Sequence, residues 1–253
     1  MSRVFLTGAG PGDPELLTLK AARVLASAEV VLHDSLVDPR IIALANPAAR
    51  IIDVGKRCGR HSATQEQICD LLVAEALAGH MVVRLKGGDP MIFGRATEEM
   101  DALRANNIDF EIIPGITAAS AASAGTKISL TQRNIARSLH IITGHGAEGG
   151  LPGHDFCALT KSGGTLAVYM GGETLPGLAA HFIESGMEPS MPAILIENAS
   201  LPNERYLHAT IATLPGLHAA HAAAGPVLIL VGEALRTTAE TVPARLESVL
   251  ADG

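Results

Sequence analysis

The chain has 253 residues and a formal net charge of −7, with five phenylalanines, two tyrosines and no tryptophan. A broad basic face with aromatic stacking platforms is therefore not expected, which argues against nucleic-acid binding. The mean hydropathy is +0.28, but no uninterrupted apolar run approaches the ~18 residues of a membrane helix, and the first residues lack the pattern of a signal peptide. These properties predict a cytoplasmic protein that does not associate with membranes.

The three cysteines are an odd number without CxxC spacing, and the ten histidines include no HExxH motif. Neither a disulfide framework nor a metal site is therefore expected. Basic residues nevertheless gather at the ends of predicted strands, which favours a small anionic ligand. These residues are the segment 56–61 and Arg84, Lys86, Arg95, Arg133 and Arg137.

The first half of the chain alternates short apolar runs with helical patterns. The runs are rich in β-branched residues and lack polar alternation, as in a parallel sheet covered on both faces. Strands are predicted at 3–8, 29–33, 49–55, 81–85 and 110–114, with helices at 16–26, 39–45, 64–78 and 95–105. A small-residue segment at 114–125 is either a linker or a tightly packed helix.

The alternation then restarts, with strands predicted at 139–145, 165–171, 192–198, 206–211 and 226–232. Helices are predicted near 156–162, at 175–185 and from Pro243 onward. The run 206–211 follows its predecessor after only a few residues, so this pair is expected to be antiparallel and the second sheet mixed. The prediction is an α/β protein of two domains, residues 1–115 and 116–253, with the active site in the cleft between them.

The most informative segment is 81–95, where the strand MVVRL ends in KGGDPMIFGR. Gly87 and Gly88 can take positive φ and let the backbone approach a ligand, and Pro90 keeps Asp89 on the loop. An ordinary turn with a capping Asp is the alternative for a single loop of this kind. A second cluster, GAGPGDPE at 8–15, ends the first strand. Two loops of one chemistry predict one site.

The first loop differs from a dinucleotide-binding turn. Asp13 stands where the third glycine of GxGxxG is expected and would repel a pyrophosphate, and no P-loop pattern follows any strand. The loops offer carboxylates, and backbone that a ligand can approach closely, rather than sites for phosphate. A cofactor with a ribose and a positive centre but no phosphate fits better, and S-adenosylmethionine is such a cofactor.

These motifs resemble the tetrapyrrole methylase family and, within it, the methyltransferases that act on uroporphyrinogen III. The resemblance is colinear over nearly the whole chain. It rests on GAGPGDPELLTLKA (8–21), HDSLV (33–37), VGKRCGRH (54–61), VVRLKGGDPMIFGR (82–95), FEIIPGITAAS (110–120), SLTQR (129–133), TGHG (143–146), VYMGG (168–172), ENAS (197–200) and PVLILVG (226–232). The segment FGRATEE departs from the commoner FGRGGEE at the start of a predicted helix. The segment NERYLHATI departs from the usual pattern near the end of the chain, and this departure concerns a local turn rather than the reaction.

The resemblance implies an S-adenosylmethionine-dependent enzyme that methylates two pyrrole carbons of uroporphyrinogen III to give precorrin-2, for sirohaem, cobalamin or haem d1. It also implies a homodimer, with S-adenosylhomocysteine as the second product and no metal. The residues that match cofactor positions are Pro11, Gly87, Gly88, Asp89, Ile92, Thr117, Ala118, Met170, Ala199 and Val227. Those that match acid/base or tetrapyrrole-facing positions are Asp34, Lys56, Arg95, Glu98 and Arg133. The 1–115 domain would hold the substrate and part of the cofactor, and the 116–253 domain would complete the cofactor site and form the dimer.

Alternatives remain open at this point. Met170 is also compatible with core packing, Lys56 with a surface charge, and Glu98 with a first-turn acid that the helix dipole favours. Rival functions are a methylase that acts later in the corrin pathway, a binding protein that keeps the pocket without turnover, and, as the weakest, a nicotinamide dehydrogenase.

Overall fold

The computed structural model describes residues 4–55, 63–146, 149–221 and 223–236. The chain divides into two compact units, Met1–Ala121 (unit 1) and Ala122–Gly253 (unit 2). The division falls inside helix α5 (Ala118–Thr126), so the small-residue segment is a helix rather than a linker. No helix among the described residues is long and apolar enough to cross a bilayer.

Unit 1 contains a five-stranded sheet in the order β3-β2-β4-β1-β5, and every neighbouring pair is parallel. Its strands are β1 (Val4–Gly8), β2 (Val30–His33), β3 (Arg50–Asp53), β4 (Val82–Lys86) and β5 (Phe110–Ile113). Its helices are α1 (Leu19–Leu25), α2 (Pro39–Ile42), α3 (Gln65–Leu77) and α4 (Ala96–Ala105). The predicted parallel sheet is confirmed.

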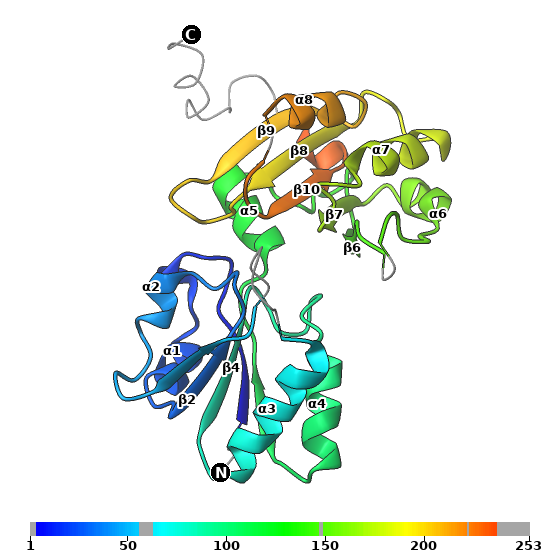
Figure 1. Cartoon of the computed structure of the whole chain (residues 1–253). Coiled ribbons are helices and arrows are strands. Elements are labelled where there is room, and N and C mark those ends of the chain that lie inside the picture. The colour runs from blue at the N-terminus through cyan, green and yellow to red at the C-terminus, as the bar shows by residue number, and fades with distance from the viewer. Residues whose placement is uncertain (1–3, 56–62, 147–148, 222, 237–253) are drawn as a thin grey trace. The chain divides into compact units, whose positions relative to one another are not determined.

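Strand β4 lies at the centre of this sheet and shows why the apolar runs are continuous. Val82 packs in a core with α3 and α4, whereas Val83 and Leu85 pack in a second core with α1 and α2. Figure 1 shows α3 and α4 beside the sheet on one side and α1 and α2 on the other. Because both faces are covered, successive side chains of β4 are all buried.

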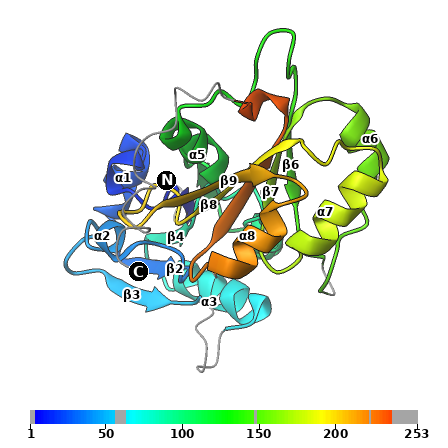
Figure 2. The same cartoon turned by 90° about the horizontal axis from the view of Figure 1, so that it is seen from above.

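Unit 2 contains a mixed sheet in the order β6-β7-β10-β8-β9, as predicted. Its strands are β6 (Leu139–Thr143), β7 (Thr165–Tyr169), β8 (Pro192–Glu197), β9 (Arg205–Thr210) and β10 (Val227–Val231). Only β6 and β7 pair in parallel, and β8 and β9 form the expected antiparallel pair. The core of the unit lies between the sheet and α6 (Phe156–Lys161), α7 (Leu175–Glu184) and α8 (Leu214–His221) (Figure 2).

Two helices differ from the prediction. Helix α1 begins at Leu19 rather than Leu16, because Asp13 caps a separate 3₁₀ turn at Pro14–Leu16 and Thr18 then caps α1. Helix α8 was not predicted, and its residues include Pro215 and Gly216, which are poor helix formers. The helix expected from Pro243 lies outside the described residues.

Candidate active site

The two Gly/Asp/Pro loops of unit 1 are hydrogen-bonded to each other at the carboxyl edge of the sheet. The Gly10 N–H donates to the Gly88 carbonyl at 3.1 Å, and the Gly88 N–H donates to the Gly10 carbonyl at 2.7 Å. Just before this pair, the Ala9 N–H donates to the Lys86 carbonyl at 2.7 Å. The loops after β1 and β4 are therefore joined by backbone hydrogen bonds, and that they belong to one site stays a prediction.

The loop after β5 joins them through glycine backbone. A Cβ on Gly115 would lie 2.1 Å from the Gly88 carbonyl oxygen, and a Cβ on Gly8 would lie 2.5 Å from the Gly115 nitrogen. Gly88 itself has φ of 68°, and a Cβ there would meet no atom of the described residues within 4 Å. Side chains are therefore excluded where the three loops touch, while the outer side of Gly88 is open to a ligand.

Asp89 has a structural task in this junction. Its Oδ1 accepts a hydrogen bond from the Met91 N–H at 2.8 Å, and its Oδ2 accepts one from the Gly115 N–H at 3.0 Å. The carboxylate thus fastens the β4 loop to the β5 loop. Each oxygen keeps a second lone pair for a ligand hydroxyl.

The cofactor candidates of unit 1 share this edge of the sheet. They follow β1, β4 and β5 directly or within a few residues, and all are partly exposed. They are Pro11, Gly87, Gly88, Asp89, Ile92, Thr117 and Ala118.

The cofactor candidates of unit 2 also share one sheet edge. Met170 follows β7, Ala199 follows β8 after one residue, and Val227 begins β10, which runs antiparallel to both strands and pairs Val227 with Glu197. Met170 has φ of 56° and a side chain that is 50% exposed, so it does not fill the core. A non-glycine residue in this conformation is strained, and such strain often accompanies functional sites.

The other candidates are distributed over both units. Asp34 follows β2, beside β4, and is partly exposed. Arg95 precedes α4 with φ of 53°, and its Nε donates to Glu98 Oε1 at 2.9 Å between two exposed side chains. Arg133 lies in an exposed turn of unit 2, and Lys56 lies outside the described residues.

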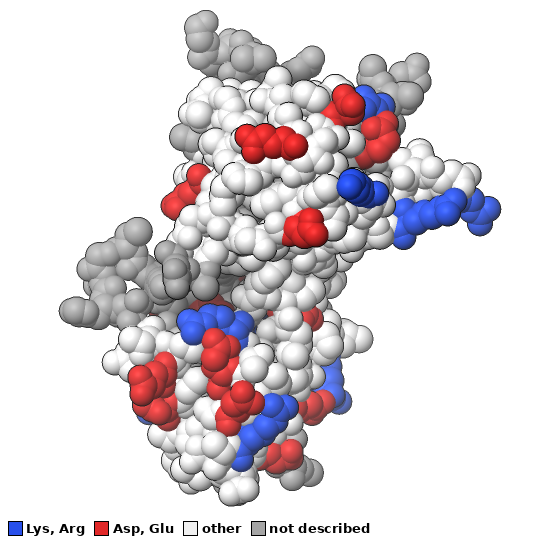
Figure 3. Space-filling view, turned by 90° about the vertical axis from the view of Figure 1, so that its right-hand side faces the viewer, with Lys and Arg blue, Asp and Glu red and all other residues white. Residues whose placement is uncertain are grey.

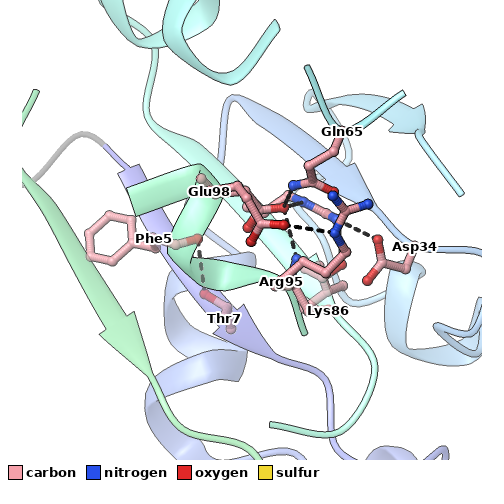
Figure 4. A network of polar contacts seen from close by, with 10 residues as sticks. Phe5, Thr7, Asp34, Gln65, Lys86, Arg95 and Glu98 are labelled. Carbon is pink, nitrogen blue, oxygen red and sulfur yellow. Dashed lines mark hydrogen bonds and ion pairs between the residues drawn. The ribbon is translucent and has the colours of Figure 1, made fainter. Parts of the chain in front are cut away.

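The interpretation of Arg84 and Lys86 as part of an anion site was wrong. Both side chains are 2% exposed, and both donate to Glu99 Oε1, at 2.9 Å from Arg84 Nε and 2.8 Å from Lys86 Nζ. Arg84 Nη2 also donates to Asp34 Oδ1 at 2.5 Å. The two cations are therefore neutralised within the protein. Figure 4 labels Lys86, Asp34 and Gln65 of this network.

This buried network was missed in the sequence, although a signal was present. Arg84 and Lys86 are two residues apart, so they project from one face of an otherwise apolar strand, which requires acidic partners above that face. Burial and the charge of Arg84 lower the pKa of the Lys86 ammonium, while Glu99 and Asp34 act in the opposite direction.

A hollow of about 500 Å³ lies at the β8–β9 end of unit 2, and Glu197 and Arg205 are among its lining residues. The Glu197 carboxylate is engaged at both oxygens: Oε1 accepts from the N–H groups of Ala224 and Gly225 at 2.7 and 2.8 Å, and Oε2 accepts from Arg205 Nε at 2.6 Å. Burial acts to raise the pKa of Glu197, but Arg205 and the two N–H groups outweigh it and lower that pKa. This carboxylate ties strands together.

Charges elsewhere on the surface are mixed. On the face shown in Figure 3, acidic and basic side chains are interspersed over each unit. Within the described residues, no group of three or more His, Cys, Asp or Glu side chains is arranged to hold a metal ion.

Comparisons with known proteins identify the family of the chain. The family model of the Tetrapyrrole (Corrin/Porphyrin) Methylases matches residues 3–215. The siroheme synthase of Pseudomonas putida is 46% identical over 92% of this chain and 50% of its own length, and that of Gluconacetobacter diazotrophicus is 42% identical over 95% and 51%. The chain thus spans about half the length of these curated relatives.

Solved structures are similar over almost their full length. The uroporphyrin-III C-methyltransferase of Thermus thermophilus, solved as a complex with S-adenyl homocysteine, is 40% identical with a TM-score of 0.79 and covers 93% of this chain and 99% of its own. A cobalt precorrin-4 methyltransferase is 29% identical with a TM-score of 0.83, and the match covers 92% and 96% of the two chains. The chain belongs to the tetrapyrrole (corrin/porphyrin) methylase family.

Proposed function

We propose that this chain is an S-adenosylmethionine-dependent C-methyltransferase that methylates uroporphyrinogen III at C2 and C7 to give precorrin-2, for sirohaem, cobalamin or haem d1 synthesis. The observation that carries the proposal is the glycine junction, whose backbone is open to a ligand beside Gly88. The Thermus thermophilus relative, 40% identical, supports both the acceptor and the cofactor. The siroheme synthases support the sirohaem branch.

The residues of this edge fit a nucleoside with a positively charged sulfur. A Cβ on Gly88 would occupy the space that a ligand needs, and the Gly88 carbonyl, which accepts one bond from Gly10, keeps a second lone pair for a ligand donor. Asp89 keeps lone pairs for ribose hydroxyls. In unit 2, considered by itself, the exposed Met170 side chain is a proposed apolar, polarisable contact for the cofactor. When bound, S-adenosylmethionine supplies an electrophilic methyl group.

The residues of the chain then orient the acceptor and handle its proton. A pyrrole carbon is electron-rich and needs no protein nucleophile, so alignment and a later proton transfer are what remain for the protein. Asp34, at the end of β2, is the proposed acid/base residue, with Lys56 as the second. Arg95 and Arg133 are proposed anchors for acetate and propionate groups, because a guanidinium keeps its proton.

Glu98 is proposed to hold Arg95 in place on the tetrapyrrole side. Their ion pair is exposed, with side chains 61% and 45% accessible. Exposed pairs contribute little free energy, so Arg95 can exchange Glu98 for a substrate carboxylate without a large cost.

A direct assay tests the function. Pure protein incubated anaerobically with S-adenosylmethionine and uroporphyrinogen III is expected to give a product two methyl groups heavier, detected by mass spectrometry. The matched control contains S-adenosylhomocysteine in place of S-adenosylmethionine. An unchanged acceptor mass would contradict the proposal.

The second candidate is a methylase that acts later in the corrin pathway, favoured by the similarity to cobalt precorrin-4 methyltransferase. Turnover of precorrin-2 without turnover of uroporphyrinogen III would select it. Binding of S-adenosylmethionine in calorimetry without transfer to either acceptor would instead select a binding protein.

Replacing Gly88 with alanine tests the cofactor edge. The protein is expected to fold with a loss of about 1–2 kcal/mol, the cost of a side chain at left-handed φ, and the Kd for S-adenosylmethionine is expected to rise at least about tenfold. Calorimetry measures the Kd. Gly186→Ala is the matched control, because Gly186 has φ of 94°, an equally open Cβ position, and a place before β8 rather than after it. Equal affinities of the two variants would show that Gly88 does not face the cofactor.

A homodimer and a cytoplasmic location are further parts of this proposal and rest on the family resemblance. Light scattering of the purified protein tests the first, and fractionation of producing cells tests the second.

A further inference from the structure

The buried charges of unit 1 form a chain that leads outward to Asp34. Glu99 and Arg84 are 0% and 2% exposed, whereas the Asp34 side chain is 31% exposed. The Arg84 guanidinium is held on three sides, because Nε donates to Glu99 at 2.9 Å, Nη1 to the Leu85 carbonyl at 3.2 Å and Nη2 to Asp34 at 2.5 Å. The accessible carboxylate is therefore bound to a guanidinium that is itself fixed.

Core stability does not account for these charges. Glu99 Oε1 accepts bonds from Arg84, Lys86 and the more distant Gln65, while Oε2 is buried and has no hydrogen-bond partner among the described residues. An orphaned buried oxygen costs free energy, and apolar residues of similar volume often replace a buried ion network without loss of stability. Val82, on the same face of β4, is an ordinary core residue.

The position of Asp34 gives the network a function. The Asp34 N–H donates to the Leu85 carbonyl at 3.2 Å, so the residue is fixed beside the end of β4, where the Gly87–Gly88 loop begins. Leu36, two residues later, would lie 3.3 Å from a Cβ on Gly87. Asp34 thus lies at the same edge as the glycine junction.

We propose that Glu99 and Arg84 are positioning residues for Asp34. Arg84 engages Oδ1 and leaves Oδ2 directed to the acceptor, and Glu99 keeps the guanidinium from turning away. The ionised Oδ2 takes up the proton that the methylated pyrrole loses and becomes a neutral carboxyl group. This inference rests on the proposed function, because it assigns the network to the proton step of that reaction.

Two substitutions test the inference in the full chain. Arg84→Lys keeps the positive charge, but an ammonium cannot bond both carboxylates as the planar guanidinium does. Glu99→Gln keeps the side-chain volume but removes the negative charge. Each is expected to lower kcat by about 10-fold to 100-fold, the effect of a misplaced group, while KM and the Kd for S-adenosylmethionine stay within about twofold. Asp101→Asn, in an exposed pair on the same helix, is the control and is expected to keep wild-type kcat.

A double-mutant cycle separates positioning from general damage. If Glu99 acts through Asp34, Glu99→Gln lowers kcat no further in an Asp34→Asn background. Thermal melts verify that each variant folds. A folded Glu99→Gln protein with wild-type kcat, or an additive loss in the double variant, would overturn the inference.

A spectroscopic measurement keeps this result distinct from failure of the proposed function. The ¹³C resonance of the Asp34 carboxyl, assigned by its absence in Asp34→Asn, is expected to shift in Glu99→Gln and in Arg84→Lys but not in Asp101→Asn. If wild-type protein methylates neither uroporphyrinogen III nor precorrin-2, the proposed function fails, and this resonance alone decides whether Glu99 positions Asp34. An unmoved resonance overturns the inference.

Discussion

Replacing Gly115 with alanine is expected to abolish binding of S-adenosylmethionine and to lower the free energy of unfolding by about 3 kcal/mol, at the upper end of what overpacking costs. The added Cβ would lie 2.1 Å from the Gly88 carbonyl oxygen and 2.9 Å from the Gly8 Cα. Both neighbours are backbone atoms, which cannot turn aside. The β4 and β5 loops must therefore separate, and the Asp89 bond to the Gly115 N–H is lost with them.

Urea unfolding and calorimetry measure the two effects. Gly216→Ala is the control, because Gly216 lies within α8 and an added Cβ there meets nothing within 4 Å. That variant is expected to be about 0.5–1 kcal/mol more stable, as alanine suits a helix better than glycine. A Gly115→Ala protein that binds the cofactor normally would mean that the three loops need not touch.

Local signals explain what the sequence predicted well. Gly, Asp and Pro act on their own turns, so the ends of β1 and β4 and the glycine loops after them could be located without the fold. The continuous apolar runs reflect a sheet covered on both faces. This could be predicted without knowing which helix packs against which face. The parallel pairing followed from the helices between the strands, whereas the order of the strands in the sheet was not predicted.

Partners distant in the sequence could not be predicted in this way. Asp89 is bound by the N–H of Gly115, 26 residues later, and that contact depends on how β4 and β5 flank β1. Glu98 and Glu99 are adjacent, so their side chains lie about 100° apart around the helix axis. Which of the two is buried depends on which side of the helix faces the core. The resemblance selected Glu98, which is exposed, whereas the network is built on Glu99.

Helix α8 illustrates a different limit. Pro215 and Gly216 lower its intrinsic helix propensity, and the segment has no strong amphipathic signal. Leu214, which is fully buried in the core of unit 2, shows that packing stabilises the helix instead. Tertiary contacts of this kind override local preference.

Replacing Glu99 with alanine is expected to lower the free energy of unfolding by about 3–5 kcal/mol near neutral pH, because it removes the ion pair of the buried Lys86 and leaves Asp34 as the carboxylate bound to the buried Arg84. Urea unfolding measures the loss. Asp101→Ala, on the exposed side of the same helix, is the control and is expected to change stability by less than about 0.5 kcal/mol.

The loss is expected to depend on pH in a direction set by Lys86. Burial and the charge of Arg84 lower the pKa of the folded-state Lys86 below its ordinary value of 10.5. At pH values just below 10.5 the unfolded chain therefore binds more protons at Lys86 than the folded protein does. In this pH range the free energy of unfolding rises with pH. Removing Glu99 lowers the pKa of Lys86 further, because the attraction that favoured the ammonium is lost. In the variant, the pH range in which stability rises with pH therefore begins at a lower pH.

The gap in stability between wild type and Glu99→Ala should therefore narrow as the pH rises from 7 toward 10, because Lys86 in the variant can shed its proton and leave Arg84 paired with Asp34 alone. Paired urea titrations at several pH values measure the gap. In a Lys86→Met background the same gap should be independent of pH, which separates Lys86 from other alkaline titrations. A gap that stays constant with Lys86 present would show that Glu99 does not control the charge of this lysine.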